Sequence, residues 1–174
     1  KKISKKILKK KKIKFVETRI KFYKKLHKIE YTDKKYFKEL RLAKTSDKKQ
    51  LYKIAQDSFR KSRFFKDKHI RETQAKKING NWILNFFNKK RGEYLIITKL
   101  KKEIAGFLLI LKNKNSFVID LIAVKKKFKK LGYASKMLNF FNYHNIKNKK
   151  IFLYSTTQSS NVESLKFYKK NNFK

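Results

Sequence analysis

Alternating apolar and polar residues define the first two predicted elements of the chain. Residues 15–22 place large apolar side chains between polar ones, which is the period-two pattern of a half-buried strand. Residues 39–43 repeat this pattern, with Leu40 and Leu42 on one face. The sequence therefore predicts a strand in each range, with a helix or loop between them that reaches to about residue 38.

Apolar residues spaced three and four apart predict helices that each bury one stripe. The first stripe follows a polar segment, residues 45–47, that offers an N-cap, and it consists of Leu51, Ile54, Ala55 and Phe59. Similar spacing recurs around Trp82, within residues 134–146 and within residues 161–170. Each of these helices needs a sheet to cover.

The sheet is predicted by three β-rich runs at residues 94–98, 103–111 and 116–124. Polar turns at residues 99–102 and 112–115 separate these runs, so they form an antiparallel meander. A further strand is expected at residues 151–154. From the strand at residues 39–43 onward, the order β-α-α-β-β-β-α-β-α indicates one α/β (α+β) domain with a mixed, mostly antiparallel sheet flanked by helices.

Composition excludes several classes of protein. The 174 residues contain neither Cys nor Pro and only four Gly, which excludes disulfide scaffolds, zinc sites with Cys ligands, Cys nucleophiles and flexible Gly- or Pro-rich linkers. The longest apolar run, residues 107–111, is far shorter than the roughly 20 residues that span a bilayer. No membrane span and no secretory leader pattern is present, so we expect a cytoplasmic protein.

The net charge of +39 has two explanations. Of the 51 basic residues, 45 are Lys, and Lys, Asn, Ile, Phe and Tyr together make up 100 of the 174 residues. AT-rich codons produce this pattern in any protein, because exposed positions tolerate Lys. Alternatively, Lys clusters follow phosphate groups on nucleic acid or on a polyanionic cofactor. Residues 1–14 form either a basic tail or a surface-bound amphipathic helix.

The segment of residues 119–135 predicts an anion site. A strand runs into a basic loop, and the loop opens directly into a helix with Gly132 and Ala134 at the turn. Small residues there leave backbone N–H groups facing outward at the positive end of the helix dipole, where a pyrophosphate binds. A Gly at such a position is also an ordinary turn residue.

Two motifs in this half of the chain resemble those of the GNAT superfamily of N-acetyltransferases. The first joins the strand at residues 121–124 to Lys129, Gly132 and Ala134, and it is similar to the acetyl-CoA motif of the family. The second runs from Asn161 through Tyr168 to Phe173 after the strand at 151–154. The resemblance implies a GNAT fold with acetyl-CoA as cosubstrate. It places the cofactor contacts at Ile122, Val124, Lys129, Lys130, Leu131, Gly132, Tyr133, Ala134, Ser135 and Asn161.

The resemblance also implies a mechanism by direct attack of an amine on the thioester. Tyr168 is the candidate general acid for the departing thiolate, and its alternative is a place on the apolar face of the last helix. Ile122 and Val124 would act through their main chains on a strand that splays from its neighbour around a bulge. Asn161 would bind the cofactor through its amide, or Ser160 and Glu163 would form a capping box beside it. The general base stays open among Asp57, Asp67, Glu93, Asp120 and bulk water.

A narrower resemblance covers more of the chain. Residues 15–19 and 55–67 are similar to the TDP-fucosamine acetyltransferase group, which acetylates a nucleotide-linked aminosugar. It implies that residues 1–38 are a basic segment at the end of a preceding domain and that residues 39–174 form the acetyltransferase domain. Arg63 and Asp67 are its candidate residues for the amine acceptor, with Arg63 facing a sugar diphosphate.

The chain departs from the family pattern at three points, and one rival function is open. Lys129 stands where the family has Arg or Gln, and Asn172 where it has Gly. The family continues with another strand after the position of Lys174, so the last C-terminal strand is expected to be missing. No metal site is expected, since the three His show no ligand spacing. The rival is a nucleic-acid binder, which the scarcity of Arg and the absence of known binding motifs disfavour.

Overall fold

The centre of the sheet is the antiparallel meander of β3 (Tyr94–Leu100), β4 (Glu103–Lys112) and β5 (Ser116–Val124). Seven consecutive residues of β4, 104–110, are buried, because both faces of this strand are covered. The computed structural model describes residues 16–26, 34–145 and 152–174. The predicted meander is confirmed within one or two residues at each end.

Three further strands complete a six-stranded sheet in the order β1-β6-β5-β4-β3-β2. Within it β2 (Leu40–Leu42) pairs antiparallel with β3, and β6 (Phe152–Gln158) pairs parallel with β5. The parallel pair follows a crossover through a helix, as parallel neighbours require. The mixed, mostly antiparallel sheet agrees with the predicted fold class.

The first strand, β1 (Arg19–Lys25), begins later than the pattern of residues 15–22 predicted. Its limits match its partner, because all seven of its residues pair antiparallel with β6. It belongs to the segment that the sequence analysis placed before the acetyltransferase domain, yet it lies in the same sheet. One edge of β1 pairs with β6. On the opposite edge of β1, Tyr23 exchanges two backbone hydrogen bonds with Lys174.

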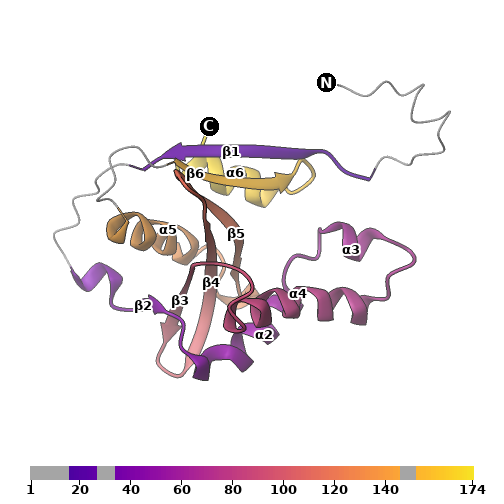
Figure 1. Cartoon of the computed structure of the whole chain (residues 1–174), viewed down its shortest axis with the longest axis horizontal. Helices are drawn as coiled ribbons and strands as arrows, with labels where there is room; N and C mark the ends of the chain where they lie inside the picture. The colour runs from indigo at the N-terminus through magenta and orange to yellow at the C-terminus, as the bar shows by residue number, and fades with distance from the viewer. Residues whose placement is uncertain (1–15, 27–33, 146–151) are drawn as a thin grey trace.

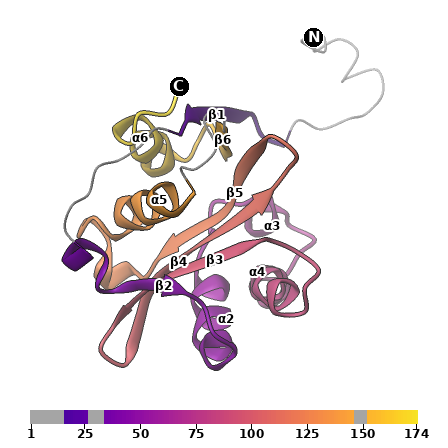
Figure 2. The same cartoon turned by 60° about the vertical axis from the view of Figure 1, so that its left-hand side comes forward.

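Helices cover both faces of the sheet (Figures 1 and 2). On one face, α5 (Tyr133–His144) and α6 (Val162–Lys170) bury Met137, Leu138, Phe141 and Tyr168 against the sheet. On the other, α2 (Lys48–Asp57) and α4 (Glu72–Phe87) bury Leu51, Ile54, Ala55 and Ile83. These two clusters are the core, and they contain the helical stripes that the sequence predicted. Short helical turns fill the connections: η1 (Lys34–Phe37), η2 (Thr45–Asp47), α3 (Arg63–Lys66) and η3 (Lys126–Phe128).

Side-chain hydrogen bonds of Asp47 fix the short helix η2 that leads into α2. The buried carboxylate of Asp47 accepts the backbone N–H of Lys44 (2.8 Å) and two hydrogen bonds from the Arg41 guanidinium (2.7 and 2.9 Å). These bonds fix the backbone that leads into the helix. The residue that the sequence offered as part of an N-cap therefore acts one turn earlier, in the short helix that precedes α2.

Some predictions fall outside the described residues: the tail of residues 1–14, residues 27–33 of the predicted helix or loop, and residues 146–151. No helix among the described residues is long and apolar enough to cross a membrane. The predicted strand at 151–154 is longer than expected and reaches Gln158. Its polar second half was missed because Ser and Thr carry no apolar pattern there.

Candidate active site

The two strands β5 and β6 separate part-way along their length. They pair from Ser116 with Phe152 up to Ile119 with Ser155, and no further pairs follow although both strands continue. In Figure 1, β1 and β6 run across the view while β4 and β5 run down it. The sheet therefore opens into a gap bounded by the second halves of β5 and β6.

A β-bulge lies at the point where the strands part. Leu109 of β4 pairs with Leu121 and Ile110 pairs with Ile119, so Asp120 is an extra residue without a partner on β4. The register shift appears in the packing, because Ile119 and Ile122 pack in the cluster under α5 and α6, and Leu121 packs in the other cluster. The bulge therefore re-aims the rest of β5.

The backbone groups of Ile122 and Val124 face the gap. Lys125 donates its backbone N–H to Ala105 of β4, and alternate residues of a strand point to opposite edges. Ile122 and Val124 therefore direct their N–H and C=O groups away from β4, toward the edge where β6 has diverged. This edge can accept an extended ligand in the way that a sheet accepts an added strand.

The first turn of α5 presents free amides beside this edge. The first intrahelical bond runs from Lys136 N–H to Gly132 C=O, so the N–H groups of Tyr133, Ala134 and Ser135 have no intrahelical acceptor. No side chain among the described residues caps them. Gly132 has φ +81°, and a Cβ on it would meet nothing within 4 Å, so the turn is open. These donors and the helix dipole form an anion site.

Lysines surround this helix terminus. Lys129 binds Glu163 in the first turn of α6 (3.0 Å), and this lysine keeps the pKa of that carboxyl below its usual value. The pair joins the segments that follow β5 and β6. Lys129, Lys130 and Leu131 are exposed, and Lys130 has φ +64°, so the loop turns sharply before Gly132.

Tyr168 lies at the base of the gap, and it is buried. Its ring is 3% exposed and stacks on Phe22 of β1 at 5.1 Å between centroids. Ser155, the last β6 residue paired with β5, donates a hydrogen bond to the Tyr168 hydroxyl (2.6 Å). Burial raises the pKa of Tyr168 to about 12, and the Ser155 hydrogen bond acts in the opposite direction. The ring of Tyr168 therefore lies on the apolar face of α6, which was the alternative to a catalytic role. Its hydroxyl lies where β5 and β6 separate.

Asn161 is the N-cap of α6. Its side-chain oxygen accepts the backbone N–H of Ser164 at 3.4 Å. Asn161 therefore caps the helix in place of the expected capping box of Ser160 and Glu163. Glu163 binds Lys129 instead, and Ser160 accepts a hydrogen bond from Lys66 (3.2 Å). The amide nitrogen of Asn161 has no acceptor among the described residues.

The two candidate acceptor residues lie on α3 and at its end. Arg63 is exposed and lies over the ring of Phe64 (5.0 Å), and Asp67 accepts the backbone N–H of His69 (2.9 Å). The backbone N–H of Asp67 donates to the Arg63 carbonyl (3.0 Å), which closes the single turn of α3. The bond between Lys66 and Ser160 brings this segment against the start of α6. Of the four carboxylates considered as general base, Asp120 lies at the bulge, where Arg91 binds it.

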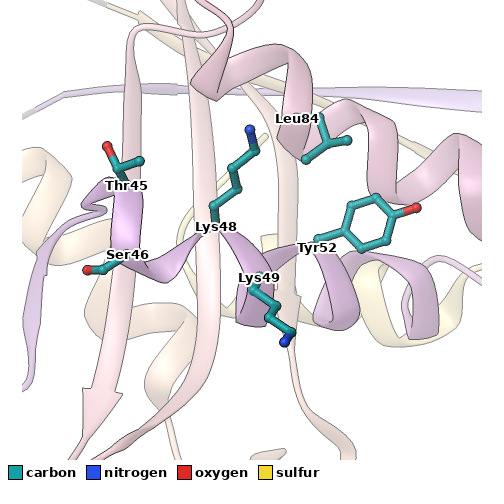
Figure 3. A pocket seen from close by; sticks show the side chains of 6 residues that line it. All are labelled: Thr45, Ser46, Lys48, Lys49, Tyr52 and Leu84. Carbon is teal, nitrogen blue, oxygen red and sulfur yellow. The ribbon is translucent and has the colours of Figure 1, made fainter.

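A separate hollow of about 430 Å³ lies between α2 and α4, lined by Thr45, Ser46, Lys48, Lys49, Tyr52 and Leu84 (Figure 3). It shares no residue with β5, β6 or the start of α5. Among the described residues, no group of three His, Cys, Asp or Glu side chains could hold a metal ion.

The residues of the gap fit coenzyme A. Ile122 and Val124 offer an unpaired strand edge, and the start of α5 offers anion donors after it along the chain. This order would suit a ligand with a long amide-bearing arm and a diphosphate. A match to the family model described as the acetyltransferase (GNAT) family covers residues 48–173. The chain belongs to the GNAT acetyltransferase family.

One curated relative matches two thirds of the chain. Over 120 residues the chain is 31% identical to the spore coat polysaccharide biosynthesis protein SpsD of Bacillus subtilis (strain 168), covering 69% of this chain and 41% of that protein. The chain thus matches less than half the length of this relative.

Two solved structures show the same fold. A functionally unknown conserved protein from Staphylococcus epidermidis ATCC 12228 has a TM-score of 0.66 at 11% identity, over 100% of this chain and 64% of that one. The PaiA N-acetyltransferase from Thermoplasma acidophilum, in complex with coenzyme A, has a TM-score of 0.57 at 20% identity, over 78% and 89%.

Sequence reasoning missed three residues of the site. Ser155 carries no signal, because a Ser in a strand is unremarkable. Gly106 lies opposite Val124, and a Cβ on it would lie 2.5 Å from the carbonyl oxygen of Ala123. A Gly inside an apolar strand is a signal for close backbone approach that could have identified it. The third, Arg91, is a loop residue whose partner only the fold reveals.

Proposed function

We propose that this protein is an acetyl-CoA-dependent N-acetyltransferase that transfers the acetyl group to a primary amine by direct attack. The observation that carries the proposal is the unpaired edge of β5 at Ile122 and Val124, which leads from the parting of β5 and β6 to the free amides at the start of α5. Acetyl-CoA supplies an acetyl group activated as a thioester. In the transfer a C–N bond forms, the C–S bond breaks, the amine loses one proton and the thiolate gains one.

The chain's own residues have distinct roles in this proposal. Backbone groups of Ile122 and Val124 hold the amide-bearing arm in the gap. The N–H groups of residues 130–135 hold the diphosphate, with charge from Lys129 and Lys130 and a contact from the Asn161 amide. For this role Lys129 must leave Glu163. Their ion pair is exposed, so it stabilises the protein by at most about 1 kcal/mol.

Tyr168 is the proposed proton donor to the sulfur. Its hydroxyl lies beside Ser155 at the base of the gap. With a pKa near 12, full transfer to a thiolate of pKa about 8.5 is uphill by roughly 3.5 units, or about 5 kcal/mol. Tyr168 therefore acts by donating a hydrogen bond as negative charge develops, with complete proton transfer following later.

The proposed acceptor is a nucleotide-linked aminosugar. SpsD is named for spore coat polysaccharide biosynthesis, which is consistent with a sugar acceptor. Arg63 and Asp67 lie in the segment that approaches the start of α6, and they are the proposed acceptor contacts. Replacing Arg63 with Ala should raise KM for the acceptor and leave KM for acetyl-CoA unchanged, whereas Arg60→Ala, which breaks an exposed pair with Glu72, should change neither.

The test is thiol release from acetyl-CoA with a panel of amines that includes nucleotide aminosugars, polyamines, aminoglycosides and peptides. We expect turnover with an aminosugar. Tyr168→Phe should lower kcat by about tenfold or more without raising KM for acetyl-CoA. Absence of both turnover and coenzyme A binding, together with RNA binding that weakens steeply with salt, would favour the rival nucleic-acid function.

A further inference from the structure

The bulge of β5 is held from outside the sheet by one side-chain pair. Arg91, in the loop between α4 and β3, binds Asp120 through Nε to Oδ2 (2.5 Å) and through a terminal nitrogen to Oδ1 (2.6 Å). The Asp120 side chain is 11% exposed. Such a bidentate pair restrains both position and orientation, which a single contact does not.

The loop that carries Arg91 is itself fixed to β4 on both sides of the bulge. Glu93 donates its backbone N–H to Ile110 C=O (2.8 Å). Gly92 has φ +87°, and a Cβ on it would lie 2.5 Å from a methyl of Leu109. Leu109 and Ile110 are the two β4 residues between which the register shifts. The guanidinium therefore reaches Asp120 from an anchored backbone.

We propose that Arg91 and Asp120 form a positioning clamp that fixes the bulge of β5 and so aims the backbone groups of Ile122 and Val124 into the gap. This inference rests on the proposed function, because its effect is read at the coenzyme A site. Neither side chain needs to touch the cofactor or the reacting atoms. Both are positioning residues, and the clamp acts on main-chain geometry one and two residues beyond the bulge.

A matched pair elsewhere separates this role from general stabilisation. Arg41 and Asp47 form the same kind of bidentate pair at the start of α2, away from β5 and β6. Replacing either arginine leaves a largely buried carboxylate without its guanidinium, which lowers stability. Breaking the pair at Asp120 should in addition change β5.

The experiment compares Arg91→Met and Asp120→Asn with Arg41→Met in the full chain. Amide hydrogen exchange of Leu121 and Ala123, whose N–H groups face β4, is measured without ligand, and coenzyme A affinity is measured by calorimetry. We expect the two clamp variants to speed exchange of these amides and to weaken coenzyme A binding by about tenfold each. Arg41→Met should leave both within about twofold of the unmodified protein, despite a comparable loss in Tm.

The outcomes are distinct. The clamp is overturned if both clamp variants exchange and bind like the unmodified protein, or if Arg41→Met has the same effects as they have. If the unmodified protein does not bind coenzyme A, the proposed function fails. The clamp is then judged by exchange alone: faster exchange confined to the clamp variants supports it, and unchanged exchange overturns it.

Discussion

Single residues decide the chemistry that the gap can perform, and Tyr168 is the clearest case. Its burial places the phenol in an environment where the neutral form is strongly favoured. A proton donor must be protonated, so a pKa near 12 keeps Tyr168 competent at every ordinary pH. Its value as a donor comes from its position beside Ser155 rather than from its acidity.

The raised pKa of Tyr168 makes stability depend on alkaline pH. In the unfolded chain the phenol ionises near pH 10, whereas the folded protein keeps it neutral to about pH 12. The folded state therefore binds the proton more tightly, and this contribution is lost as pH rises from about 10 to 12. Urea unfolding at rising pH should show a steeper fall for the unmodified protein than for Tyr168→Phe. Parallel curves would show that the hydroxyl is not buried in solution.

Gly132 is the residue on which the anion site depends. Its φ of +81° is left-handed, and the surrounding space is open, so only backbone strain opposes a larger residue. Gly132→Val should shift the start of α5 and weaken coenzyme A binding by about tenfold or more, while Tm falls little. Gly132→Asn, which tolerates this conformation, should keep affinity within about threefold. Unchanged affinity in the Val variant would contradict the proposed cradle.

At the scale of elements, the contact between β4 and β5 positions the free edge of β5 at Ile122 and Val124. Gly106 lies opposite Val124, where the carbonyl of Ala123 leaves no room for a Cβ. A methyl group here must push the two backbones apart, since the nearest atom is a backbone carbonyl oxygen.

Gly106→Ala should therefore cost about 1–3 kcal/mol of unfolding free energy and also weaken coenzyme A binding. Chemical unfolding and calorimetry measure the two effects. Gly80→Ala is the matched control, because it crowds the ring of Tyr52 on α2 and leaves β5 unchanged. Equal losses of affinity in both variants would show that general destabilisation is responsible.

At the scale of the whole molecule, β1 belongs to the support of the active site. Its residue Phe22 is 5% exposed and stacks on Tyr168, and Lys24 donates to the Asn171 carbonyl at the end of α6 (2.9 Å). We propose that β1 is part of the acetyltransferase domain, and that the domain begins before residue 39.

Phe22→Ala tests this arrangement. Removing a buried aromatic ring should cost about 3–5 kcal/mol and should release the Tyr168 ring. We expect kcat to fall with Tm. A matched change on the exposed face of the same strand, Tyr23→Ala, should lower Tm less and leave kcat unchanged. An unaltered kcat in Phe22→Ala would separate β1 from the catalytic site.

The charge of +39 is a property of the whole molecule as well. Lysines near the active site are partly neutralised, since Glu103 binds Lys125 and Lys127, and Glu163 binds Lys129. The remaining excess attracts polyanions at low salt whatever their identity. Charge alone therefore does not identify the ligand of this protein.

Periodicity in the sequence determined the fold class, the central meander, the main helices and the turn at Gly132, because these depend on local spacing and on residues near each other in the chain. The two family motifs identified β5, the strand proposed to hold the cofactor, and the helix that carries Tyr168. Tertiary structure decided the rest: the bulge at Asp120, the bond from Ser155 to Tyr168, and the place of β1 beside β6. Each of these joins residues far apart in the chain, and no local pattern records which distant partner a residue meets when the sheet closes.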